Sequence, residues 1–181
     1  MNLETERLIL RPWAETDAEA LYRYASDPQV GPAAGWQPHT SVEDSRQIIR
    51  DVLSAPGTFA VVLRATGEAV GSAGVMRAGS GTAPIAQDEA EIGYWIGRAH
   101  WGQGLIPEAV RELERYCFEE LNCRGLWCGY YEGNEKSRRV QQKCGFVPHH
   151  TEENKLCAKL GEYRTEHFTY LTREDWEKAR R

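Results

Sequence analysis

The sequence predicts a mixed α/β fold, in which a mostly antiparallel sheet carries helices on both faces. Three observations lead to this fold class. Strand-like and helix-like segments alternate along the 181 residues. The segment Glu89–Tyr131 follows the order strand, helix, strand, which predicts a right-handed crossover and a central parallel strand pair. Other strand-like segments are joined by turns such as Thr66-Gly67, which allow antiparallel hairpins.

Length and composition favour one domain spanning residues 1–181, because domains of ~100–200 residues are common. The net charge of −5 argues against a broad basic face for nucleic acid. Five cysteines without a CxxC pair predict reduced thiols in a cytoplasmic protein. The chain has neither an apolar run of ~20 residues nor a signal-peptide pattern at its start, so no membrane partner is expected. The sequence does not determine the oligomeric state, and a homodimer is one alternative.

The first part of the chain predicts a strand and a helix before one long loop. Leu3–Arg11 contains three consecutive apolar residues and is predicted as a strand. Helical spacing of apolar residues then predicts a helix to about Ser26, capped by Thr16 or Asp17. The segment Asp27–Thr40 has three prolines and two glycines and is predicted as a loop. Loops of more than ~12 residues inside compact domains are often functional.

The middle of the chain predicts a second helix and three strands. Ser41 is the predicted cap of this helix, which Pro56 ends. Thr58–Arg64 and Ala69–Arg77 are predicted to form a hairpin. A flexible connection over residues 78–88 precedes the next strand, Glu89–Ile96.

The helix after Gly104 has the most regular spacing of apolar residues and is predicted to end near Asn122. Pro107 falls in its first turn, where a missing N–H is harmless. The remaining elements are a buried strand, a helix opened by Asn134 and stopped at Gly145, two further strands and a terminal helix. These strands are Gly125–Tyr131, the short segment 146–150 and Glu162–Thr172, and the terminal helix covers residues 173–181.

The stretch "WGQGLI", residues 101–106, places two glycines between a strand and a helix. The first turn of a helix offers unpaired N–H groups and a partial positive charge. Glycines there let a phosphate approach the backbone closely, so the stretch predicts an anion site. The chain has neither the GxxxxGK[ST] motif nor the dinucleotide GxGxxG arrangement, which disfavours both of those nucleotide sites.

Four stretches together resemble the GCN5-related N-acetyltransferase (GNAT) family, in the branch that contains the ribosomal-protein N-terminal acetyltransferases. They span nearly the whole chain in the family's order. The stretches are "TERLILRPW" (Thr5–Trp13), "EIGYWIGRAHWGQGLIPEAV" (91–110), "NEKSRRVQQKCGF" (Asn134–Phe146) and "GEYRTEHFTYLTREDW" (Gly161–Trp176).

The resemblance implies acetyl-coenzyme A as donor, a primary amine as acceptor and a sheet splayed at the central parallel pair. The acceptor is a protein N-terminus or a small-molecule amine. The implied coenzyme-binding residues are Tyr94, Trp95 and Ile96 for the pantetheine arm, Trp101, Gly102, Gln103, Gly104, Leu105 and Ile106 for the diphosphate, Asn134 for the arm, and Arg98 and Arg139, with Arg138 or Lys136, for phosphates.

Glu91 is the preferred general base or water-ordering residue, because the resembling strand carries a glutamate base in the family's histone acetyltransferases. Alternation places Glu91, Gly93 and Trp95 on one face of the strand. Other carboxylates that compete for this role lie after the last predicted core helix, namely Glu152, Glu153 and Glu162.

Ser137 is the preferred acid for the leaving thiolate, as the branch with N-x-x-S implies. Many family members place a tyrosine in this helix, whereas the matching residue here is Gln141, which cannot serve as an acid. Tyr130 and Tyr131 are the alternative phenols. The resemblance assigns the oxyanion donor to the backbone N–H of Trp95 or Ile96.

The absent tyrosine also supports a second hypothesis, a non-catalytic acyl-coenzyme A sensor or interaction module. No metal is expected, because His149-His150 has no further ligands at a familiar spacing. The acceptor site is expected in the loop Asp27–Thr40, which carries Trp36, and in the segment His149–Gly161.

Overall fold

The computed structural model describes residues 1–181, and the chain divides into two units. Two strands, β4 (Ala69–Met76) and β5 (Glu89–Ile96), each have residues in both units. The first unit holds Met1–Gly74 and Tyr94–Ala109, and the second holds Val75–Gly93 and Val110–Arg181. The hydrogen-bonded strand order is β1-β2-β3-β4-β5 in the first unit and β5-β6-β8-β7 in the second.

The first unit is built on antiparallel strands. These are β1 (Leu3–Glu4), β2 (Leu8–Arg11), β3 (Thr58–Leu63) and the first part of β4. Leu10 pairs with Val61, which in turn pairs with Gly71, and a bulge follows Val61. Gly97 donates its N–H to the Val70 carbonyl at 2.8 Å, so the end of β5 is held against β4.

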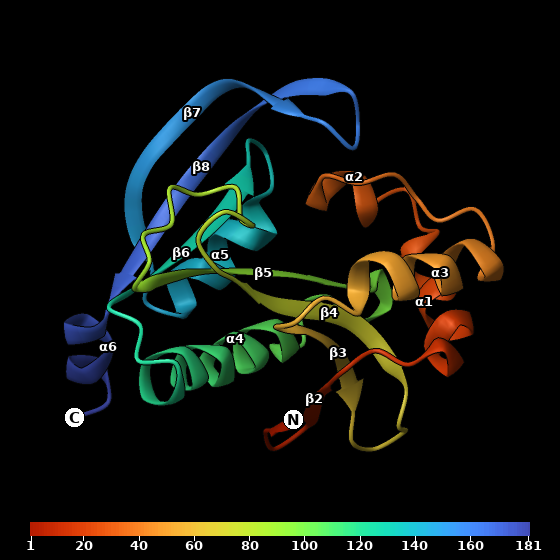
Figure 1. The fold of residues 1–181 in the computed structure, drawn as a ribbon, viewed down its shortest axis with the longest axis horizontal. Helices are drawn as coiled ribbons and strands as arrows, with labels where there is room; N and C mark the ends of the chain where they lie inside the picture. Colours follow the sequence, from red (N-terminus) through yellow and green to blue (C-terminus); the bar gives the residue numbers. More distant parts are fainter. The chain divides into compact units, whose positions relative to one another are not determined.

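Two helices of the first unit, α1 (Ala18–Ala25) and α3 (Val42–Ile48), lie side by side on one face of these strands (Figure 1). The core below them includes Trp13, Leu21, Ile49, Ala60 and Val62. The Oγ of Ser41 accepts the Asp44 N–H at 3.0 Å, which confirms Ser41 as the cap of α3. Burial of each large apolar side chain in such a core stabilises the fold by about 1.5–3 kcal/mol.

The second unit contains the parallel strand pair. Residues Glu89–Glu91 of β5 pair with Gly125–Trp127 of β6 (Gly125–Tyr131). The strand β8 (Glu162–Thr172) runs antiparallel to β6, and β7 (Val147–Cys157) pairs with β8 in a long curved hairpin (Figure 1). The predicted fold class, mostly antiparallel with one parallel pair, is therefore confirmed.

A buried carboxylate ties three strands of the second unit together. Glu89 is 5% exposed and accepts hydrogen bonds from the Trp127 indole and the Tyr170 hydroxyl, both at 2.7 Å. Arg124 contributes a further hydrogen bond at 3.0 Å. Since a buried charge is costly unless it is hydrogen-bonded, these partners allow a charged residue inside the sheet.

Three further helices come after β5, β6 and β8, namely α4 (Leu105–Arg115), α5 (Glu135–Lys143) and α6 (Arg173–Ala179). The helix α4 starts in the first unit and continues through a π turn at Tyr116–Glu120 in the second. Asn134 begins α5 by accepting the Ser137 N–H, and Thr172 begins α6 by accepting the Asp175 N–H. No helix has both the length and the apolar character needed to cross a membrane.

The structure corrects three expected elements. The first predicted strand is two short strands, β1 and β2, which pair with each other. The predicted loop Asp27–Thr40 contains a four-residue helix, α2 (Gly31–Ala34), with Pro32 in its first turn and Gly35 left-handed at its end. The predicted short strand at 146–150 is instead the 11-residue β7. Its side chains are mostly exposed and polar, so the segment has no alternation of apolar and polar residues that would predict a strand.

Candidate functional site

The residues predicted to bind the donor and to catalyse transfer divide between the two units. The first unit holds Tyr94, Trp95, Ile96, Arg98, Trp101, Gly102, Gln103, Gly104, Leu105 and Ile106, and the second holds Glu91, Asn134, Ser137 and Arg139.

In the first unit, the turn into α4 exposes backbone at the start of a helix. Gly102 and Gly104 have φ angles of +73° and +75°, a region that L side chains rarely adopt. A Cβ built on Gly102 meets no atom within 4 Å. In the first turn of α4, the N–H groups of Leu105 and Ile106 have no acceptor within the helix, Pro107 has no N–H, and the Glu108 N–H donates to the Gly104 carbonyl at 3.2 Å. This turn therefore has the open backbone and the partial positive charge of an anion site.

An ion pair that the sequence did not reveal anchors this turn. The Glu108 carboxylate accepts hydrogen bonds from Thr5 Oγ1 at 2.5 Å, Arg7 N at 2.8 Å and Arg7 Nε at 2.6 Å. Arg7 Nη1 also donates to the Gln103 carbonyl at 2.9 Å. Burial raises the pKa of Glu108, but the bonds from Thr5 and Arg7 outweigh it, and the net pKa lies below the usual value. Arg7 thus adds a cation beside the glycine turn.

The backbone of β5 presents two sets of groups to opposite edges, since successive peptide groups of a strand alternate. A Cβ on Gly71 would lie 2.3 Å from the Trp95 carbonyl oxygen, so the backbone groups of Trp95 face β4. Those of Tyr94 and Ile96 consequently face the edge away from β4. The Ile96 carbonyl accepts the Trp101 indole N–H at 3.0 Å, which joins the turn to the strand end.

Two more predicted residues of the first unit have defined neighbours. Arg98 Nε lies 2.8 Å from Asp27 Oδ2, an ion pair that holds the Arg98 side chain at the start of the Asp27–Thr40 segment. The rings of Trp36 and Trp95 meet edge to face with centroids 5.3 Å apart. Trp36 also packs against His39, so an aromatic cluster links this segment to β5.

In the second unit, Glu91 is 4% exposed and bound by the connection between β4 and β5. Its Oε2 accepts the N–H groups of Thr82 and Ala83 at 2.7 and 2.8 Å, and its Oε1 accepts the Thr82 hydroxyl at 2.9 Å. A carboxylate has about four acceptor positions, so about one stays on Oε1. The connection that the sequence predicts as flexible is therefore held in place at Thr82.

Thr82 also connects Glu91 to an ionic cluster on β7 and β8. Its hydroxyl oxygen lies 3.1 Å from Glu166, and its carbonyl accepts Lys155 Nζ at 2.9 Å. Lys155 Nζ lies 3.1 Å from Glu166 and 2.7 Å from Glu152. Burial, with a smaller contribution from the Glu91 charge, raises the pKa of Glu166, and Lys155 opposes this shift.

At the start of α5, two side chains hold Ser137. The Asn134 Oδ1 accepts its N–H at 3.2 Å, and the Gln141 Nε2 donates to its Oγ at 3.2 Å. Gln141 is 1% exposed, whereas Ser137 is partly exposed.

The remaining cationic and acidic candidates lie near the surface of the second unit. Arg139 is exposed, and Arg138 pairs with Glu135 at 2.8 Å. Among the alternative bases, Glu162 pairs with Arg164 at 2.5 Å. Glu153 is exposed.

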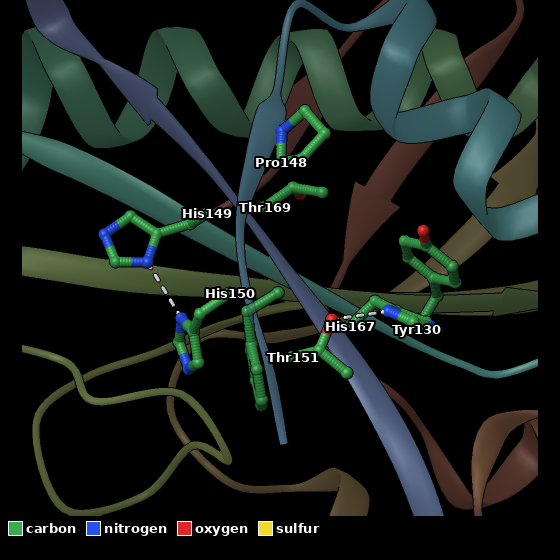
Figure 2. Close-up of a pocket in the computed structure, with 8 residues that line it drawn as sticks. Tyr130, Pro148, His149, His150, Thr151, His167 and Thr169 are labelled. Carbon is green, nitrogen blue, oxygen red and sulfur yellow. Dashed lines mark hydrogen bonds between the residues drawn. The ribbon is translucent and has the colours of Figure 1, made fainter. Parts of the chain in front are cut away.

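A pocket of about 200 Å³ opens between β6, β7 and β8 (Figure 2). Its lining consists of Tyr130, Pro148, His149, His150, Thr151, His167, Phe168 and Thr169. The Nδ1 atoms of His149 and His150 are 2.8 Å apart, so at least one ring is neutral and accepts there. No three His, Cys, Asp or Glu side chains form a group that can hold a metal ion. Burial raises the pKa of Tyr130, which keeps this phenol protonated.

Comparison with known proteins shows the class of protein to which this chain belongs. Residues 7–147 match the family model for the Acetyltransferase (GNAT) domain, so the chain belongs to this family. The family uses acetyl-coenzyme A as acyl donor.

The chain is similar to named bacterial N-acetyltransferases. It is 38% identical over 152 residues to the "Uncharacterized N-acetyltransferase p20" of Bacillus licheniformis, covering 80% of this chain and 82% of that protein. It is 37% identical over 89 residues to the "Putative ribosomal N-acetyltransferase YdaF" of Bacillus subtilis, covering 49% and 48% of the two chains.

The fold is shared with solved structures of the same class. The structure of Mycobacterium smegmatis RimJ in complex with CoA-disulfide superposes with a TM-score of 0.75 at 22% identity, covering 97% of this chain and 88% of that one. The chain is therefore a GNAT-type N-acetyltransferase by family and by fold.

Proposed function

We propose that the chain transfers the acetyl group of acetyl-coenzyme A directly to the primary amine of a protein N-terminus or a small molecule, in a ternary complex. The open glycine turn at the start of α4 carries this proposal, because its N–H groups suit a diphosphate. Acetyl-coenzyme A supplies the thioester carbon that the amine attacks.

The donor-binding roles are proposed for each unit separately. In the first unit, the turn Trp101–Ile106 is proposed to hold the diphosphate, the outward edge of Tyr94 and Ile96 the pantetheine arm, and Arg98 a phosphate. In the second unit, the Asn134 amide is the proposed contact for the arm and Arg139 the proposed contact for a phosphate. The backbone alternation favours the N–H of Ile96, rather than that of Trp95, as the donor to the developing oxyanion.

Glu91 has a water-ordering role in this proposal. A lysine or N-terminal amine is largely protonated at neutral pH and must lose a proton before it attacks. Glu91 already accepts three hydrogen bonds from Thr82 and Ala83, and about one acceptor position stays on Oε1. A water bound there receives the proton from the amine and passes it to the Glu91 carboxylate, while the fixed Thr82 segment keeps that water in position.

Ser137 is the proposed acid for the leaving thiolate. Its N–H is bound by Asn134 and its Oγ by Gln141, which gives this hydroxyl a defined position. Proton transfer from a positioned side chain typically contributes 10²–10⁴-fold to a rate. Tyr130 and Tyr131 are the phenols that would take this role if Ser137 does not.

The choice of acceptor depends on the Asp27–Thr40 segment and on the β7–β8 hairpin. The hairpin carries both signs of charge, in Lys155, Glu152 and Glu166, and so does not by itself select a cationic peptide. Similarity to a protein named as a ribosomal N-acetyltransferase supports a protein N-terminus as the first acceptor to test.

The test is a thiol-release assay with acetyl-coenzyme A and a panel of amines. The panel contains peptides with free N-termini, lysine peptides whose N-termini are blocked, polyamines and aminoglycosides. All five cysteines are buried, which limits the background from the enzyme's own thiols. We expect amine-dependent release, a product that carries one acetyl group by mass spectrometry, and slower turnover in Glu91→Gln and Ser137→Ala.

Calorimetry with coenzyme A separates the ways in which the proposal can fail. Absence of coenzyme binding overturns it. Tight binding without transfer to any amine, and without an effect of Glu91→Gln or Ser137→Ala, identifies an acyl-coenzyme A sensor instead.

A further inference from the structure

Gln141 is a polar side chain inside the second unit, and every polar atom of its amide has a partner. It is 1% exposed. Its Nε2 donates to the Gly129 carbonyl of β6 at 2.9 Å and to Ser137 Oγ at 3.2 Å. Its Oε1 accepts the Thr169 hydroxyl of β8 at 2.8 Å. One amide therefore joins α5 to two strands and contacts the proposed acid.

The Gly129 carbonyl determines which way this amide points. A backbone carbonyl can only accept, so the atom of Gln141 that faces it must be the NH₂ group. The same NH₂ group faces Ser137 and has no lone pair to offer. Ser137 Oγ is consequently the acceptor in this contact, and its own hydroxyl hydrogen points elsewhere.

We infer that Gln141 is a positioning residue that keeps Ser137 in the proton-donating orientation for the leaving thiolate. This inference rests on the proposed role of Ser137. As the amine forms the C–N bond, the C–S bond breaks and its electron pair goes to sulfur. The Ser137 proton passes to that sulfur, and the serine regains a proton from solvent. The Gln141 N–H stabilises the charge that develops on Oγ.

Packing alone does not require a glutamine at this position. A buried amide costs free energy unless its hydrogen bonds are made, whereas an apolar side chain of similar volume avoids that cost. The amide contributes what an apolar residue cannot, a donor directed at Ser137. Methionine is the suitable replacement, because it is unbranched and fills irregular volumes.

A double-mutant cycle tests the inference. Gln141→Met, Ser137→Ala and the double variant are compared with the wild-type protein by kcat and by the KM for acetyl-coenzyme A. We expect Gln141→Met to lower kcat about tenfold with KM nearly unchanged, and to have no further effect in the Ser137→Ala background.

Equal losses from Gln141→Met in the wild-type and Ser137→Ala backgrounds overturn the inference, because they show an effect independent of the serine. If Ser137→Ala is fully active, the proposed acid is wrong and the inference falls with it. If Ser137→Ala is slow but Gln141→Met is not, only the inference fails.

Thermal unfolding would reveal whether Gln141→Met has a folding defect. A second variant, Gln141→Glu, tests the inference independently in that case. Gln141→Glu keeps a donor only while its carboxyl is protonated. We expect its kcat to fall relative to wild type as pH rises, and a loss that does not vary with pH contradicts the inference.

Discussion

Arg7 and Glu108 are 101 positions apart in the sequence, yet Arg7 Nε lies 2.6 Å from Glu108 Oε2 at the start of α4. The same guanidinium donates to the Gln103 carbonyl. This one arginine, immediately before β2, thus connects the start of that strand with both the helix and the glycine turn before the helix. This relationship makes the conformation of the turn depend on the N-terminal strand.

Replacing Arg7 should weaken donor binding. We expect Arg7→Ala to raise the KM for acetyl-coenzyme A several-fold and to change kcat little, because the turn loses its anchor and a nearby cation. Arg64→Ala is the matched control, since Arg64 has similar exposure and pairs with Glu4 at 2.5 Å. Steady-state kinetics on both variants check this, and equal effects on KM would contradict it. Either exposed pair contributes only about 0–1 kcal/mol of stability.

Gly102 and Gly67 separate backbone strain from ligand contact. Both have left-handed φ angles, +73° and +72°, and a Cβ at either position meets no atom within 4 Å. Alanine at either glycine should cost about 1–2 kcal/mol of unfolding free energy. Only Gly102→Ala should also raise the KM for acetyl-coenzyme A, because its methyl group occupies the space that the diphosphate needs. The idea fails if Gly67→Ala changes KM to the same extent.

Glu114 should make the protein less stable as pH rises. Burial raises its pKa to about 8, Arg111 and Arg180 oppose the shift, and Oε1 has no hydrogen-bond partner. The folded carboxyl thus holds a proton that the unfolded one releases near 4.5. Stability is unaffected below that pH, declines up to about pH 8 and is constant above it.

Glu114→Gln removes this titration. We expect it to stabilise the fold by on the order of 3 kcal/mol at pH 7 and by nothing near pH 4, measured by urea unfolding. A constant difference between the two pH values would show that the pKa of this carboxyl is the same in the folded and unfolded states.

Glu89 should have the opposite dependence on pH. Burial raises its pKa, but hydrogen bonds from Tyr170 and Trp127 lower it further, so the folded value lies below 4.5. The resulting stability is present above pH 4.5 and is lost as pH falls through the lower, folded value. Glu89→Gln should lose about 1.5–3 kcal/mol at neutral pH. The stability of Glu89→Gln should also vary less than that of the wild-type protein on acidification. Thermal unfolding at neutral pH and at a pH below 4.5 would show this.

Much of the secondary structure was predictable because its signals are local. The strands Glu89–Ile96, Gly125–Tyr131 and Glu162–Thr172 have the predicted bounds, and the helix begins after Gly104 as predicted. Most of these segments have a buried side whose apolar pattern matches the period of the element. In contrast, β7 has few buried residues, so its pairing with β8 is not visible in its own sequence.

The candidate site was predictable only in part. The glycine turn and Ser137 are local motifs, and both were found from residue spacing or resemblance. Arg7, Thr82 and the contacts of Gln141 were missed, because each acts on a residue brought near it by strand pairing or helix packing. No signal in the residues around Thr82 indicates that it binds Glu91.

The sequence by itself determined the class of fold, the family and the place of the glycine turn proposed to bind the diphosphate, since periodicity, glycine positions and motif order are properties of the linear chain. Tertiary structure alone decided the hydrogen-bonding state of each side chain. It placed the Glu91 carboxylate against Thr82 and Ala83, and it directed the Gln141 amide toward Ser137. Such contacts depend on distances of about 3 Å between segments far apart in the chain, and local sequence does not encode those distances.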